Sequence, residues 1–151
     1  MSSFLNFPTV TARLKTLVTV IAFITVCCTQ LSAQIVSEQL FHRWENLARE
    51  GYGLSHELIY GDLDDSSNGY VYLNLRSDRT YQIYSPCDYD CDDIDLCLYD
   101  EYDNLISCDD KPDDQPEINF SPSKDARFKL KVIMYNCEIE PCKYGVGVFS
   151  R

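Results

Sequence analysis

Carboxylates and cysteines crowd together between Cys87 and Asp114, and they are the side chains of this sequence best suited to chemistry. Twelve of the 24 acidic residues lie between Asp88 and Asp114, where Lys111 is the only basic residue. Calcium takes about six to eight oxygen ligands, and closely spaced carboxylates on cross-linked loops can supply them. The stretch therefore predicts a calcium site, and its candidate ligands are Asp92, Asp93, Asp95 and Asp110.

Simpler interpretations of the same acids stay open. Aspartate is common in turns because its side chain bonds its own backbone, and an acidic surface keeps an exported protein soluble. The spacing lacks the central glycine and terminal glutamate of an EF-hand. Two facing carboxylates could hydrolyse a glycoside, but they need a substrate cleft that a small sandwich seldom encloses.

Other catalytic signals are weak. His42 and His56 are the only histidines, and neither accompanies a G-x-S-x-G elbow, an H-E-x-x-H pair or a glycine-rich phosphate loop. Disulfide pairing would also consume the cysteine thiols. We expect no catalytic residue. The alternative is a small secreted hydrolase, or a hydrolase inhibitor, that uses the acidic hairpin.

Residues 1–33 have the composition of a signal peptide. Arg13 and Lys15 supply positive charge, an apolar run follows over Thr16–Cys28, and the segment ends with Leu31-Ser32-Ala33. The apolar run is shorter than the roughly 18 residues that a bilayer-spanning helix needs. The sequence therefore predicts export, cleavage before Gln34, and no membrane span in the processed protein, which would be secreted or periplasmic.

Six cysteines remain after processing, and an even number in an exported chain indicates a disulfide framework. The pattern predicts two strands, over residues 96–100 and 105–109, on either side of the turn 101–104. Symmetric pairing of these strands places Cys97 opposite Cys108. Opposed residues lie roughly 4.5 Å apart at a non-hydrogen-bonded site, which a disulfide can span. We therefore expect a Cys97–Cys108 disulfide.

The remaining four cysteines would then form Cys87–Cys91 and Cys137–Cys142, and each pair closes a short loop. A cross-link between the two loops is the alternative. A zinc site is disfavoured, because export leads to an oxidising compartment and no histidine is near in the sequence.

An amphipathic helix is predicted within residues 34–54, where it would pack on the remainder of the chain. Ser37 can cap it, and Gly51 and Gly53 can end it. Its apolar stripe consists of Val36, Leu40, Trp44, Leu47 and Ala48. Glu38, Arg43, Glu45 and Arg49 are expected to face water. A helix that binds a partner is the alternative.

Residues 55–151 alternate as strands do, and seven or eight short strands predict a β-sandwich. In one strand Phe128, Leu130, Val132 and Met134 share a face opposite Arg127, Lys129 and Lys131. Tyr144, Val146 and Val148 repeat this pattern. Gly145 and Gly147, on the opposite face, leave room for a close neighbour. The predicted strands cover 69–75, 80–84, 94–99, 105–108, 117–120, 126–135 and 143–149.

The processed chain would carry 11 Lys and Arg against 24 acids, a net charge of −13. Nucleic acid is therefore an unsuitable partner, whereas cations, basic proteins and neutral glycans remain open. The 11 tyrosines favour strands, but they also suit a surface that binds protein or sugar. The candidate binding surface consists of Tyr99, Tyr102, Tyr135 and Tyr144.

The string DIDLCLYDEYDNLISCDD resembles the central hairpin of the bacterial pre-peptidase C-terminal domain family. The similarity extends more weakly from GYGLSHELIYGDL to RFKLKVIMYNCEIEPCKYGVGVF. The strings CDYDC, DDKPDDQPEI and NCEIEPCKYGVGVF resemble a small secreted cyanobacterial variety of the domain. The resemblance implies a jelly-roll-like antiparallel sandwich, usually a non-catalytic appendage of secreted hydrolases. We therefore expect a disulfide-stapled extracytoplasmic module that binds a protein or polysaccharide.

Overall fold

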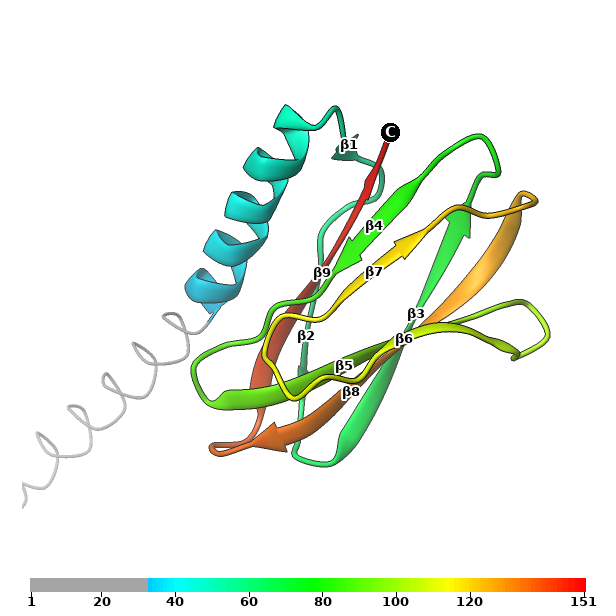
Figure 1. The fold of residues 1–151 in the computed structure, drawn as a ribbon. Coiled ribbons are helices and arrows are strands. Elements are labelled where there is room, and N and C mark those ends of the chain that lie inside the picture. The colour runs from blue at the N-terminus through cyan, green and yellow to red at the C-terminus, as the bar shows by residue number, and fades with distance from the viewer. Residues whose placement is uncertain (1–32) are drawn as a thin grey trace, which may run out of the picture. The chain divides into compact units, whose positions relative to one another are not determined.

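The computed structural model describes residues 33–151, which form one helix and nine strands in two antiparallel sheets (Figure 1). The predicted signal peptide, residues 1–33, lies outside the described residues except for Ala33. No helix within the described part is long and apolar enough to cross a membrane. The mainly β architecture agrees with the predicted sandwich, with one strand more than the largest number expected.

The helix covers residues 33–49 and ends where the sequence predicts. Gly51 has a positive φ of 87°, which glycine adopts at little cost. The Gly51 amide donates to the Ala48 carbonyl at 3.2 Å, and the Tyr52 amide donates to the Leu47 carbonyl at 3.0 Å. This pair of bonds is a Schellman ending. The predicted cap at Ser37 is wrong, because residues 33–36 are already helical.

The buried face of the helix differs in part from the predicted stripe. Val36, Leu40 and Leu47 are buried, but Trp44 and Ala48 are exposed. Arg43 takes the position between Leu40 and Leu47, where it forms an ion pair with Glu117 and lies 5.4 Å from the centre of the Tyr84 ring. A residue three positions after Leu40 lies on the same face, so Arg43 faces the sheet and not water.

The first sheet has five strands, and β9 lies at its centre. Strands β1 and β2 pair with different parts of β9 along one edge, while β4 pairs with its other edge and with β7. The bounds are β1 (Gly53–Leu54), β2 (Ile59–Leu63), β4 (Tyr81–Tyr84), β7 (Glu117–Phe120) and β9 (Cys142–Ser150).

The second sheet has four strands in the order β3, β8, β5, β6. In β8, Phe128, Leu130, Val132 and Met134 are buried, as the alternation predicts. They face a core between the sheets that also contains the inward side chains of β3, β5 and β9. The bounds are β3 (Ser67–Leu75), β5 (Cys91–Tyr99), β6 (Leu105–Asp109) and β8 (Ala126–Cys137).

The helix lies along the outer face of the first sheet, where two glycines of β9 let it approach (Figure 1). A Cβ atom at Gly145 would lie 2.7 Å from Leu40 Cδ1 and 2.8 Å from Val36 Cγ1. A Cβ atom at Gly147 would lie 3.1 Å from Leu40 Cδ2. The close neighbour that the two glycines indicate is therefore the helix.

Candidate functional site

Five carboxylates gather where the open end of the β5–β6 hairpin meets the segment that follows it. We call this group the acidic end, and its members are Asp93, Asp95, Asp109, Asp110 and Asp113. Strand β5 supplies Asp93 and Asp95, and β6 ends at Asp109. The following segment is held against β5, because the Ile94 amide donates to the Asp113 carbonyl at 3.1 Å.

Partial burial and repulsion between carboxylates raise the pKa values of two members of the acidic end. The pKa of Asp95 is raised to about 6, first by loss of solvent and then by the charges of the other four members. The pKa of Asp93 is also raised, first by loss of solvent and then by Asp113. Ionising both groups is therefore unfavourable in the folded protein, and a nearby positive charge would relieve that cost.

The protein itself supplies little positive charge to the acidic end. Lys111 Nζ donates to Asp109 Oδ1 at 2.7 Å, and within residues 33–151 this is the only ion pair that involves a member of the group. The second oxygen of Asp109 accepts the Glu117 amide at 2.9 Å. Asp109 is thus a structural carboxylate. The other four members of the acidic end have no ion pair within residues 33–151, so solvent or a partner can interact with their charges.

Two disulfide-closed loops lie beside the start of β5. The disulfides Cys87–Cys91 and Cys137–Cys142 close them, and Cys91 pairs with Cys137 between β5 and β8. The buried Asp88 carboxylate accepts the Lys143 amide at 3.0 Å, which connects the first loop to β9. Covalent and hydrogen-bonded links therefore hold the backbone from which the first members of the acidic end project.

The third disulfide joins Cys97 to Cys108, which lie opposite each other on β5 and β6 with Cα atoms 4.1 Å apart. All three pairs are those that the strand pattern and the spacing predict. The cross-link between the two loops, which was the alternative, does not occur among these cysteines.

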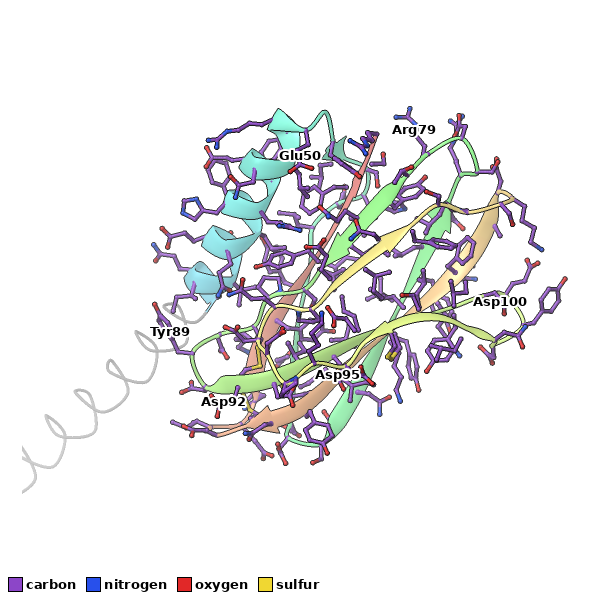
Figure 2. The ribbon with its side chains drawn as sticks, viewed as in Figure 1. Glu50, Arg79, Tyr89, Asp92, Asp95 and Asp100 are labelled. Atoms are coloured by element: carbon purple, nitrogen blue, oxygen red, sulfur yellow. A yellow bond between two sulfur atoms is a disulfide. The ribbon has the colours of Figure 1, made fainter. Side chains whose placement is uncertain are left out.

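The acids at the closed end of the same hairpin have partners. We call Asp100, Glu101 and Asp103 the turn acids. The Asn104 side chain donates to one Asp100 oxygen at 2.9 Å, and the backbone amides of Asn104 and Tyr102 donate to the other at 2.8 and 2.9 Å. These bonds lower the pKa of Asp100, the one from the Asn104 side chain most. Glu101 and Asp103 form ion pairs with Lys124 and Lys129. Figure 2 shows Asp100 at the tip, far from Asp92 and Asp95.

The predicted calcium ligands do not form a coordination shell as the side chains are placed. Within residues 33–151, no three acidic, histidine or cysteine side chains are arranged to hold a metal ion. Asp92 faces Asn136, 3.4 Å from its amide nitrogen, and it is not among the charges that act on Asp95. Calcium binding stays a prediction from the sequence.

The four tyrosines of the predicted binding surface do not form one surface. Tyr144 is buried, and its ring occupies the space beside Gly61, where a Cβ atom would lie 2.7 Å from it. The inclusion of Tyr144 was therefore wrong, because its side chain points inward with Val146 and Val148. Tyr102 and Tyr135 are exposed, and Tyr99 is half-buried.

A different group of aromatic residues covers the outer face of the second sheet. Tyr70 and Tyr72 on β3 are more than half exposed. The Arg127 guanidinium lies 4.3 Å from the centre of the Tyr72 ring, and Lys129 Nζ lies 5.5 Å from that of Tyr70 and 5.1 Å from that of Tyr99. The cation–π contacts occupy these ring faces. Tyr70 and Tyr72 alternate along β3, and from this alternation the sequence could have predicted that they lie on one face of the sheet.

Neither histidine takes part in the acidic end. His42 Nδ1 lies 3.5 Å from Glu45 on the exposed side of the helix. His56 Nδ1 lies 2.8 Å from the hydroxyl of Ser55, its neighbour in the sequence.

No protein-family model matches the chain, and no curated protein sequence matches it either. Among solved structures, the chain is similar to the pre-peptidase C-terminal domain of collagenase from Bacillus anthracis, with 20% identity and a TM-score of 0.49 over 61% of this chain and 87% of that one. It is also similar to Aeromonas hydrophila PliG, a periplasmic lysozyme inhibitor of g-type lysozyme, with 8% identity and a TM-score of 0.50 over 66% of this chain and 89% of that one.

The similarity to PliG, at 8% identity, concerns the fold alone.

Proposed function

We propose that the protein works outside the cytoplasm as a non-catalytic binding module that holds a basic protein against its acidic end. The observation that carries this proposal is the group of five carboxylates with Lys111 as its ion-pair partner among residues 33–151. A perturbed group with a physical cause is a candidate for a functional site.

Charge complementarity gives the reason for a basic partner. Lysine or arginine side chains brought to the acidic end would stabilise the ionised form of Asp95, whose pKa is about 6 in the free protein. Complementary charges across an interface speed association and exclude partners of the same charge. The partner would therefore be selected by the sign of its surface charge, and the affinity of the complex should fall as salt is added.

The backbone that carries the acidic end is pre-organised for binding. Disulfide-closed loops and paired strands fix the backbone at the start of β5, so little conformational freedom is lost on binding. Three disulfides are also typical of proteins in oxidising compartments. PliG has a related fold and inhibits g-type lysozyme, which makes a hydrolase a reasonable kind of protein partner to test first.

Direct binding to a purified g-type lysozyme and to a panel of basic and acidic proteins tests the proposal. We expect saturable binding to one or more basic proteins at pH 7 and none to acidic ones. The double variant Asp95→Lys/Asp110→Lys should weaken that binding by about tenfold or more, because it places like charges in the interface. Affinity should also fall as the pH is lowered through about 6, because Asp95 takes up a proton there.

The matched control reverses two acids at the other end of the hairpin. Glu101→Lys/Asp103→Lys changes the net charge by the same amount, but it lies at the turn and away from the acidic end. We expect this variant to change the affinity much less. Equal losses in the two double variants would show that overall charge, and not the acidic end, determines binding, and the proposal would then be rejected.

A further inference from the structure

A second polar site lies at the end of the molecule formed by the β3–β4 connection and the last residues of β9. It is a pocket of about 480 Å³, a size within the range of small-ligand cavities. Figure 2 shows Arg79 at this end, well away from Asp95. The lining residues with polar side chains include Ser55, His56, Asn74, Arg76, Arg79 and Arg151.

The charge of this pocket opposes that of the whole protein. Residues 33–151 contain six arginines and have more than twice as many acidic as basic residues, yet three of the six arginines line this one pocket. Guanidinium groups present planar pairs of donors that fit carboxylate, sulfate and phosphate oxygens. The lining therefore indicates an anionic ligand.

The three arginines differ in how far the protein neutralises them. Arg76 donates to both oxygens of Asp78, at 3.0 and 2.6 Å, and Asp125 adds a further negative charge nearby. Arg151 lies 4.6 Å from the centre of the Tyr52 ring and donates to the Glu50 carbonyl at 3.4 Å. Within residues 33–151 neither Arg79 nor Arg151 has a carboxylate partner. These two guanidinium groups are thus available to a ligand.

The remainder of the lining offers polar groups, including a hydrogen-bond acceptor, to the hydroxyl groups of a ligand. The Ser55 hydroxyl donates to the Val148 carbonyl at 3.1 Å, so it accepts a hydrogen bond from His56 Nδ1 at 2.8 Å. With the proton on Nδ1, His56 Nε2 takes no part in the contact with Ser55. Gly53 also lines the pocket, and a Cβ atom there would have no neighbour within 4 Å, so the wall at this position is open.

We propose that this pocket binds an oxyanion carried by a small polar molecule: a carboxylate, sulfate or phosphate group, of which a sugar acid or a sugar sulfate has a fitting size. Arg79 and Arg151 would bind the charged group, whereas Arg76, paired with Asp78, would form part of the pocket wall. Ser55, His56 and Asn74 would contact the uncharged part. The site is independent of the acidic end, so either proposal can fail alone.

Titrations of the exported protein with glucuronate, glucose 6-sulfate, inorganic sulfate and uncharged glucose test this site. Calorimetry gives the affinity, and NMR shifts of backbone amides at 55, 56, 79 and 150 give the location. We expect saturable binding of one or more of the three anions but not of glucose. Arg79→Gln should weaken it by about tenfold or more, the usual effect of losing a charged hydrogen bond. Arg151→Gln should act in the same direction.

Arg127→Gln is the matched control, because it removes an arginine from the face of the second sheet that contacts Tyr72. It should leave the anion affinity within about twofold. Tighter binding of the sugar anions than of inorganic sulfate would identify a saccharide ligand, and equal binding would identify the free oxyanion as sufficient. Equal losses in Arg79→Gln and Arg127→Gln, or no saturation by any of the anions at millimolar concentrations, would overturn the proposal.

Discussion

Both ends of the β5–β6 hairpin are rich in acids, yet the acids at the two ends differ in what they do. At the closed end, Asp100 accepts hydrogen bonds from its own turn, while Glu101 and Asp103 pair with lysines. At the open end, loss of solvent and neighbouring carboxylates raise the pKa values of Asp93 and Asp95, and within residues 33–151 Lys111 is the only ion-pair partner of the acidic end. The fold provides partners for the acids at the closed end, whereas most carboxylates at the open end have no ion pair within residues 33–151.

The difference shows that acid density alone does not distinguish a structural carboxylate from a binding one. What distinguishes them is the basic residues that the topology brings near. Strand β8 runs beside β5 and carries Lys129 toward the turn, and Lys124 comes from the connection before β8. At the other end of that pairing β8 presents Met134 and Asn136 to β5, and neither can neutralise an aspartate.

The largest effect should come from the disulfide that lies between the two groups. The double variant Cys97→Ala/Cys108→Ala opens a covalent loop with a sequence separation of 11 residues. Loop-closure entropy then predicts a loss of about 3 kcal/mol in the free energy of unfolding. Urea denaturation followed by fluorescence measures it. A loss below about 1 kcal/mol would show that pairing with β8 holds the hairpin without the cross-link.

A smaller effect should separate the two kinds of carboxylate directly. Asp100→Ala removes an acceptor for two turn amides and for the Asn104 side chain, so the melting temperature should fall by several degrees. Asp110→Ala at the acidic end removes a repulsive charge and should leave the melting temperature unchanged or higher. Differential scanning calorimetry compares them. The reverse order would contradict the assignment of structural and binding acids.

The sequence predicted those parts of the fold that depend on local patterns. Alternation placed Phe128 and Met134 in the core, and the symmetry of the hairpin placed Cys97 opposite Cys108. The missing side chain at Gly145 indicated a close neighbour, which is the helix. Strands β1 and β2 were not predicted, since β1 has two residues and β2 contains Gly61, which reads as a break.

The candidate sites were less accessible, because they depend on contacts between distant segments. The ion pair of Arg43 with Glu117 joins residues far apart in the sequence, so the partner could not be foreseen and the charge of Arg43 led to the prediction that it faces water. The arginine pocket draws on the segments around Ser55, Asn74, Arg79 and Arg151, and no spacing rule connects them. Tyr144 is the exception, since its alternation with Val146 already indicated an inward position.

The smallest effect concerns the pH dependence that distinguishes the acidic end from the turn. Because the pKa of Asp95 is about 6 in the folded protein and near 3.8 as a reference, its ionised form is disfavoured by folding. Stability should therefore fall between about pH 4 and pH 6 through this group, and the full cost should be present above pH 6.

Asp95→Asn removes this titration and should stabilise the protein at pH 7 but not at pH 4. The shift alone corresponds to about 3 kcal/mol, but solvent and salt screen a partly exposed carboxylate, so we expect about 1 kcal/mol. Urea unfolding at both pH values measures the difference, with Asp92→Asn as control because Asp92 does not act on Asp95. If both variants gave the same pH dependence as the parent, mutual repulsion would not explain the acidic end, and its carboxylates would be ordinary surface charges.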